Sequence, residues 1–508
     1  MIRHTLLCLC FALLASSAWG QAARPALADP QKPGDTPAAP PNEATAVRVV
    51  KLTLSPAPEP NPALQYELLP SAAERRPGNR ATNYYRAILH ETQWLAQLSR
   101  EERKQHWDNQ AKWSELALAE LPQEDVRKWL AAYQGSFREL KEAAYREHCE
   151  FDLRTQDLRG FDTVGFVLHD FQEMRTLARA LVMRARLELA EGNQAAAIET
   201  LRQGYQLAQD ATEPPLLINA LIGIAIAGTM NEVLVELIDQ PGSANMYWAV
   251  TALPRPLVDM QRALRAEMEL PVRMFPFLKD AETVERSAEE WQRLMAQALQ
   301  DIQGLGGMGP SHLPSWQAKL AVAGALLKAY PEAKQLLLEA GYPQEKLDKM
   351  PVAQVVAIQA SRANRHAYHE MFKWSLLPYP ESNNRMEEAV QKLQREGYLG
   401  GRFAVNDPLM ISSLLLPAVS NTTHASARID REFAALRALE AIRMHAAVNG
   451  TLPASLADVA IVPVPENPAT GEAFPYAVQD GVARLTLPTV GHQSAKVYEI
   501  TLEPAVQK

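Results

Sequence analysis

Apolar side chains recur at alternating spacings of three and four residues through much of this chain, and this periodicity constrains the fold more than any other feature. The clearest stripe comprises Val126, Leu130, Tyr133, Phe137, Leu140 and Ala144. Such spacings place residues on one face of an α-helix. We therefore expect one amphipathic helix that ends near His148. The helix before it is expected to begin with a capping box formed by Ser99 and Glu102.

Two further stripes flank a turn signal and predict a helical hairpin. The first contains Met174, Leu177, Leu181, Ala185 and Leu189, and the second contains Ala197, Ile198, Leu201 and Tyr205. Gly192 and Asn193 lie between the stripes, and the pattern resembles a tetratricopeptide repeat. Glu188 stands where such repeats have an aromatic side chain, and no second copy follows at about 34 residues. A generic antiparallel helix pair is the alternative.

Further helical patterns cover residues 257–270, 288–303, 316–330, 352–374 and 385–395, and prolines mark many of their boundaries. A last stripe, with Phe433, Leu436, Leu439, Ile442 and Met444, follows Arg428 and runs to Gly450. Val-rich and Thr-rich segments then predict a hairpin near Phe474 and a third strand near residues 497–502. The expected fold is mainly α: a multi-helix antiparallel bundle or an irregular α-solenoid, with a small C-terminal α+β module.

The N-terminal residues predict an exported protein. Arg3 precedes an apolar run over residues 6–15 and small residues through Gly20, which is the pattern of a secretory signal peptide cleaved near Gly20. Removal of this leader leaves Cys149 as the only cysteine, so no disulfide can form within one chain. The expected location is the periplasm or the outside of the cell.

Composition divides the chain into four expected segments. They are a signal peptide (1–20), a Pro/Ala-rich linker (21–60), an all-α helical domain of one or two subdomains (61–427) and a helix-plus-hairpin module (428–508). Of the 36 prolines, 12 lie between Pro25 and Pro77 among few aromatic residues. Such a segment buries too little apolar surface to offset its ordering entropy, so residues 21 to about 60 are expected to be disordered.

Charge and hydropathy exclude two classes of partner. The 51 Lys and Arg face 59 Asp and Glu without a dense basic run, which argues against nucleic-acid binding. Residues 214–231 carry no charge and are just long enough to span a bilayer. Asn219, Thr229 and the leading prolines dilute the segment, so we expect a buried central helix and no transmembrane span in the mature chain.

Several longer stretches carry a family resemblance. They are Tyr66-Glu-Leu-Leu-Pro70, Pro77-Gly-Asn79, Asn83-Tyr-Tyr-Arg-Ala87, Leu221-Ile-Gly-Ile-Ala-Ile226, Gln240-Pro-Gly242, Asn245-Met-Tyr-Trp-Ala249 and Leu253-Pro-Arg-Pro256. Together they resemble an uncharacterised family of secreted, helix-rich planctomycete proteins. The resemblance implies an exported helical protein and assigns no catalytic residue.

The C-terminal part also resembles known modules. Ile429-Asp-Arg431, Leu452-Pro-Ala-Ser-Leu456 and Asn467-Pro-Ala-Thr-Gly471 are similar to a helix-plus-hairpin module common in that phylum, and to the tails of major pseudopilins. In pseudopilins a processing site and an apolar helix lead directly into the tail, whereas about 400 residues intervene here. The secretion-machine role is therefore not implied.

One set of residues is a candidate metal site. His366, His369 and Glu370 lie close together in a helical pattern, and a spacing of three residues can direct two imidazoles at one ion. The orders typical of zinc proteases, H-E-x-x-H and H-x-x-E-H, are absent. Arg362 and Arg365 in the same pattern favour a solvated polar face instead.

Other patterns with possible chemistry are less specific. Gly304, Gly306 and Gly309 fit a dinucleotide-binding pattern, but a helix precedes them where a strand is needed. His169-Asp170 resembles half of a metal pair, and the thiol of Cys149 lies beside His148. Structural roles are favoured for these residues. The tryptophans, including Trp94, Trp107, Trp113 and Trp129, are interpreted as core or groove residues.

These patterns lead to two functional hypotheses. The first is a secreted or periplasmic, non-enzymatic helical scaffold that binds other envelope proteins, with no catalytic residues and no cofactor. The alternative is a metal-dependent or other hydrolase whose residues are scattered over the helical body, with His366, His369 and Glu370 as candidates. A pocket that joins these three to a further ligand would favour the enzyme, whereas a solvent-facing histidine pair would favour the scaffold.

Overall fold

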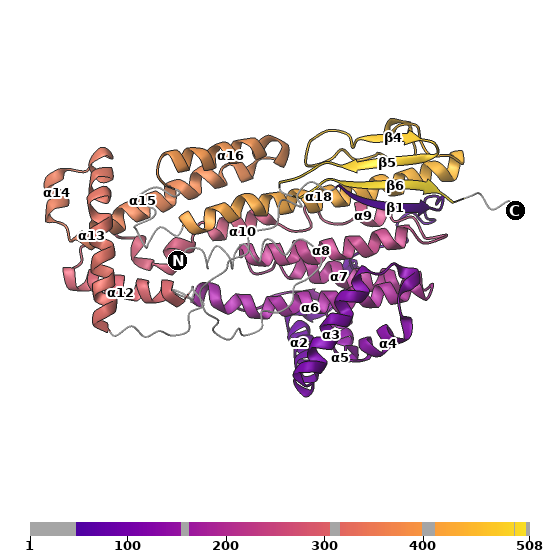
Figure 1. Cartoon of the computed structure of the whole chain (residues 1–508), viewed down its shortest axis with the longest axis horizontal. Coiled ribbons are helices and arrows are strands. Elements are labelled where there is room, and N and C mark those ends of the chain that lie inside the picture. Colours follow the sequence, from indigo (N-terminus) through magenta and orange to yellow (C-terminus); the bar gives the residue numbers. More distant parts are fainter. Residues whose placement is uncertain (1–46, 154–161, 305–314, 399–411, 492, 504–508) are drawn as a thin grey trace, which may run out of the picture.

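The computed structural model describes residues 47–153, 162–304, 315–398, 412–491 and 493–503. The protein is elongated and mainly helical, with a small sheet on one side of one end (Figure 1). The expected fold class, mainly α with a small C-terminal α+β part, is confirmed. The signal peptide and most of the expected linker lie outside the described residues.

The N-terminal helices project from the side of the long body in Figure 1. They are α2 (Arg80–Gln97), α3 (Arg100–Glu115), α4 (Gln123–Ala131) and α5 (Gln134–Ala144). Two short parallel strands, β2 (Arg76–Asn79) and β3 (Arg146–His148), hold the two ends of this unit together. The capping box of Ser99 and Glu102 starts α3, as predicted.

The long stripe between Val126 and Ala144 is buried as predicted, but the single helix is wrong. The amides of Ala132 and Tyr133 bond to carbonyls only three residues back, so the end of α4 tightens, and α5 begins at Gln134. The second helix also ends at Ala144, because residues 146–148 pair as β3.

The central helices run along the length of the molecule. They are α6 (Asp162–Ala190), α7 (Gln194–Asp210), α8 (Leu217–Ile238), α9 (Tyr247–Thr251) and α10 (Met260–Glu267). Helices α6 and α7 form the predicted hairpin: Gly192 takes a left-handed φ of 76° in the turn, and the Asn193 side chain caps α7. The tetratricopeptide resemblance itself stays a prediction.

Helix α8 is the central element of the core. It packs against α6, α7 and α18 (Ser412–Asn449). Among the described helices, α8 alone is long and apolar enough to cross a membrane, and 67% of its most apolar window is buried inside the protein. The predicted buried helix over residues 214–231 is therefore confirmed, with its start at Leu217.

A further group of helices lies at the other end of the molecule (Figure 1). These helices surround a second cluster of apolar side chains. They are α11 (Leu270–Met274), α12 (Ala288–Gly304), α13 (Ser315–Glu339), α14 (Gln344–Lys349) and α15 (Val352–Phe372), and α16 (Tyr379–Arg395) follows beside α15. Three boundaries differ from those predicted. Helix α13 continues through the exposed Pro331, residues 257–270 form the shorter α10 and then α11, and α16 begins at Tyr379.

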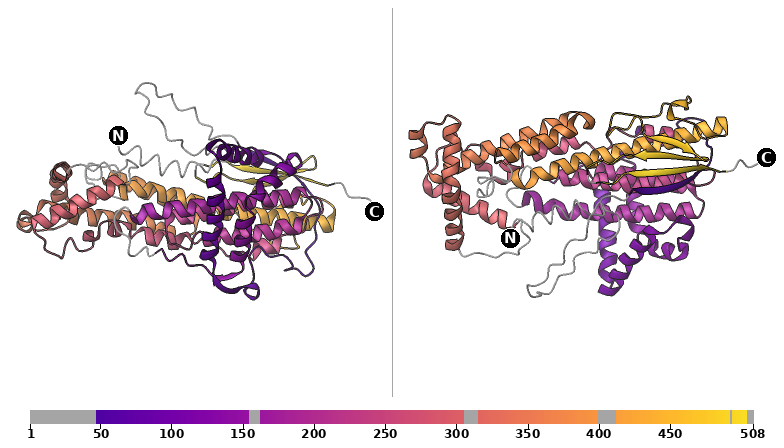
Figure 2. Two further views of the ribbon diagram at one scale, coloured as in Figure 1. Left: turned by 90° about the horizontal axis from the view of Figure 1, so that it is seen from below. Right: turned by 45° about the horizontal axis from the view of Figure 1, so that its top comes forward.

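A four-stranded sheet lies beside the C-terminal part of α18 (Figure 2). The order is β1 (Arg48–Leu54), β6 (Lys496–Leu502), β5 (Val482–Leu487) and β4 (Tyr476–Gln479). The predicted hairpin and third strand are confirmed as β4, β5 and β6. The predicted linker is wrong for residues 48–54, because β1 pairs in parallel with β6 along its whole length and buries Leu52 and Leu54. Five short 3₁₀ segments complete the described elements: Ala72–Glu74, Leu118–Glu120, Pro276–Leu278, Trp374–Leu376 and Leu456–Asp458.

Candidate functional site

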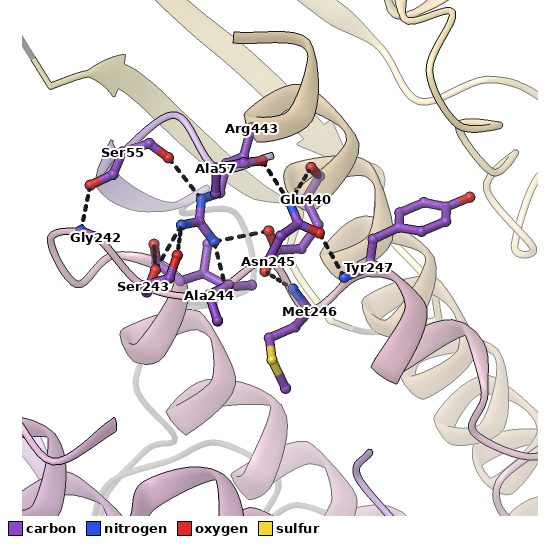
Figure 3. Close-up of polar contacts among 11 residues, drawn as sticks. Ser55, Ala57, Gly242, Ser243, Ala244, Asn245, Met246, Tyr247, Glu440 and Arg443 are labelled. Carbon is purple, nitrogen blue, oxygen red and sulfur yellow. Dashed lines mark hydrogen bonds and ion pairs between the residues drawn. The ribbon is translucent and has the colours of Figure 1, made fainter. Parts of the chain in front are cut away.

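A fully buried ion pair on α18 lies at the centre of a polar cluster in the core (Figure 3). Glu440 and Arg443 lie 2.9 Å apart and both side chains have zero exposure. The guanidinium also donates to the carbonyls of Ser55 at 3.0 Å and Ser243 at 2.6 Å, and to the Ser243 hydroxyl at 2.8 Å. Arg443 therefore joins α18 to the segment after β1 and to the loop after α8.

The carboxylate side of this cluster is equally well bonded. Glu440 accepts a hydrogen bond from the Met246 amide at 2.9 Å, and the Asn245 side chain donates to the Glu440 carbonyl at 3.0 Å (Figure 3). Burial raises the pKa of Glu440, although Arg443 acts in the opposite direction. Because the charged groups bond to each other and to enclosed backbone, we interpret this cluster as a structural clasp.

The candidate metal ligands do not come together. His366 Nε2 lies 3.4 Å from Glu396 Oε2, and the His369 side chain is exposed. Glu370 instead accepts hydrogen bonds from Lys373 at 2.8 Å and Lys392 at 2.9 Å, which lower its pKa to about 2. Within the described part of the chain, no group of three His, Cys, Asp or Glu side chains is placed to hold a metal ion.

The remaining sequence candidates give no reactive arrangement either. Cys149 is partly buried, burial raises the pKa of its thiol, and its neighbour His148 points into solvent from β3. Such a thiol is a poor nucleophile, because the thiolate is the reactive form. The side chains of His169 and Asp170, and most of the glycine motif at residues 304–309, lie outside the described residues.

The tryptophans near the N-terminus surround a buried histidine. His106 stacks on Trp129 with ring centres 4.7 Å apart, and its Nε2 lies 2.8 Å from the Tyr133 hydroxyl. Burial lowers the pKa of His106 to about 4, so its ring is neutral at pH 7. Trp129 and Trp113 are buried and Trp94 is half-buried, in agreement with the predicted core role.

An open groove lies where α4 and α5 meet the C-terminal end of α6. Its cavity volume is about 450 Å³. We call it the basic groove; it is lined by Arg127, Leu130, Gln134, Phe137, Arg138, Lys141, Arg184, Leu187, Glu188 and Glu191. Four of these side chains are cationic and two are anionic. The floor is apolar because Leu130, Phe137 and Leu187 belong to the main core.

The α6 side of the basic groove is neutralised internally. Arg184 lies over the Phe137 ring at 5.1 Å and donates to Glu188 at 2.9 Å. Glu188 also accepts a hydrogen bond from Thr200 on α7 at 2.7 Å. Arg127 from α4 bonds to Glu191 at 2.5 Å. These contacts fix the wall and leave it without excess charge.

The α5 side of the basic groove keeps excess positive charge. Arg138 pairs at 3.9 Å with the adjacent Glu139, whose carboxylate also accepts a hydrogen bond from Asn83 at 2.8 Å. Lys141 forms no ion pair with any residue that the structure describes. Gln134, one turn before Arg138, is exposed at the same wall.

The sequence patterns did not identify the basic groove, although they contained part of its signal. Arg138 and Lys141 lie three residues apart and flank the buried stripe of α5, so they share one helix face. Glu188 was notable only as a departure from the tetratricopeptide pattern, and it now lines the groove. Three helices must pack together before these residues form one surface.

Comparison of this chain with protein-family models, with curated proteins and with solved structures gives no match. The resemblance to a planctomycete family therefore stays a prediction. Function has to be inferred from the arrangement of the side chains.

Proposed function

We propose that this chain is an exported, non-enzymatic helical scaffold that binds a protein partner through the basic groove. The observation that supports this role is the pair of exposed cations beside an apolar floor: Lys141, and Arg138, whose contact with Glu139 is long at 3.9 Å. A concave surface with a few polar groups around an apolar base is typical of binding sites. The N-terminal leader pattern supports a location in the periplasm or outside the cell.

The alternative function, a metal-dependent hydrolase, has less support. Its best candidate carboxylate, Glu370, is engaged by two lysines, and a carboxylate paired in this way is a weak base and a poor ligand. His366 contacts Glu396, which directly follows α16, instead of Glu370. His369 is exposed and His366 contacts Glu396, so the two imidazoles do not converge on one ion.

Site-specific photo-crosslinking tests the proposed function. A benzophenone amino acid at Gln134 lies inside the basic groove, whereas the same residue at Lys128 lies on α4 outside it. In cells that export the chain, we expect a discrete adduct from position 134 and none from position 128. Equal adducts from both positions, or no adduct from position 134, would contradict a binding role for the groove.

A further inference from the structure

The charges around the basic groove are unbalanced on one wall only. On the α6 side, Arg184 and Glu188 neutralise each other. On the α5 side, the Arg138 side chain is 70% exposed and Lys141 is also exposed. Arg138 has a long ion pair with the largely buried Glu139 at 3.9 Å. A partner therefore meets two exposed cations on one side and a neutral, partly apolar surface on the other.

From this asymmetry we propose that the basic groove binds an acidic segment of a partner protein in an extended conformation, an inference that rests on the function proposed above. Arg138 and Lys141 are three residues apart on α5, so their Cα atoms are separated by about 4.5 Å along the helix. Alternate side chains of an extended chain point the same way and repeat every 6.5 to 7 Å or so. Long, flexible cationic side chains can bridge that difference, and each reaches one carboxylate.

The opposite face of such a segment lies against the floor and the α6 wall. Leu130, Phe137 and Leu187 offer a small apolar area there. Gln134 supplies an amide that can both donate to and accept from a peptide backbone. The preferred partner sequence therefore alternates acidic residues with small or apolar ones.

Other anionic partners fit less well. A single phosphate needs donors that converge on one point, whereas Arg138 and Lys141 project from an open rim. A flat anionic membrane cannot follow a concave groove flanked by carboxylates such as Glu124, which is 77% exposed. Nucleic acid is disfavoured by the formal charge of −8 on the whole chain.

Fluorescence anisotropy with a defined peptide tests the proposal. The probe is a fluorescein-labelled octapeptide of alternating Glu and Ala, and the matched probe has Gln in place of Glu. The protein is the full chain from residue 21 onward. We expect the Arg138→Glu, Lys141→Glu double variant to weaken binding of the Glu peptide by about tenfold or more. The milder Arg138→Ala, Lys141→Ala variant should weaken it less, and the Gln peptide should bind poorly to all forms.

A charge-matched control separates local from general electrostatics. Lys104 on α3 and Lys128 on α4 do not line the basic groove, and the Lys104→Glu, Lys128→Glu variant changes the net charge equally. Binding within about twofold of wild type in this control supports the proposal. An equal loss in both double variants would overturn it, as would displacement of the peptide by millimolar phosphate or equal binding of vesicles that contain anionic lipid.

The result also distinguishes this inference from the proposed function. An adduct from position 134 in cells, together with no preference for the Glu peptide over the Gln peptide, would refute the acidic partner and leave the groove as a binding site. Failure of both the adduct and the peptide would refute the proposed function itself.

Discussion

Replacement of Arg443 by methionine should be among the most damaging single changes to the fold. The substitution removes a guanidinium that pairs with Glu440 at 2.9 Å and bonds to backbone carbonyls of two other segments. It leaves a carboxylate with zero exposure without its counter-ion. Loss of one partner of a buried pair typically costs about 3 to 5 kcal/mol. Because whole domains are stable by only about 5 to 15 kcal/mol, we expect a large decrease in the urea concentration at which half of the protein is unfolded.

A surface pair on α16 provides the matched control. Arg385 and Glu388 have the same spacing of three residues and lie 3.1 Å apart, but their side chains are 59% and 63% exposed. Exposed pairs contribute about 1 kcal/mol or less, so Arg385→Met should change stability by less than about 1 kcal/mol. The comparison therefore separates a buried pair that is also bonded to the backbone from an exposed pair of the same spacing.

Urea unfolding at pH 7, followed by circular dichroism, measures both variants. Hydrogen exchange adds a local test, because the clasp holds the backbone at Ser55 next to β1. In Arg443→Met we expect faster exchange over residues 48–57 than over α2, which the clasp does not touch. A cost below about 1 kcal/mol, or one equal to that of Arg385→Met, would refute the structural role assigned to the clasp.

Three further changes have defined outcomes. Burial lowers the pKa of His106 from 6.5 to about 4, so between these pH values the unfolded chain binds the proton and the folded chain does not. The free energy of unfolding should therefore fall by about 2 to 3 kcal/mol as the pH drops from 6.5 to 4. Urea unfolding of His106→Gln should lack this decline. Burial raises the pKa of Glu267 to about 7, so the contribution of its protonated carboxyl to stability is complete below about pH 4.5 and is lost as the pH rises through 7. Glu267→Gln should therefore raise the melting temperature at pH 8 and not at pH 4. A gain at both pH values would contradict the raised pKa. Gly223→Ala places a Cβ 2.7 Å from the Ala208 carbonyl oxygen and should destabilise the fold by about 1 to 3 kcal/mol. Gly228→Ala, whose Cβ meets nothing within 4 Å, should leave the stability unchanged. Equal effects of the two substitutions in chemical denaturation would show that close helix packing does not cause the loss at Gly223.

Local patterns predicted the helices well, because helix periodicity depends on residues only a few positions apart. The stripes in α5, α7 and α18 and the buried run in α8 follow directly from spacing. Boundaries were less predictable. Helix α18 begins at Ser412 instead of after Arg428, and α5 begins at Gln134, after a break that the apolar stripe does not indicate.

Features that depend on distant residues were not predictable. Strand β1 pairs with β6, more than 400 residues away. The many prolines around residues 48–54 predict a linker, although Val50, Leu52 and Leu54 alternate as in a short strand. Glu370 is unavailable as a metal ligand partly because Lys392 forms an ion pair with it from another helix, α16. The basic groove likewise exists only where α4, α5 and α6 meet.

The yield of the photo-crosslink from position 134 tests the binding role most directly when it is measured with and without the cations Arg138 and Lys141. We expect a discrete adduct in the otherwise wild-type chain. We also expect a loss of most of that adduct in the Arg138→Glu, Lys141→Glu background and no loss in the Lys104→Glu, Lys128→Glu background. An adduct of equal yield in all three backgrounds would contradict the claim that these cations recruit the partner.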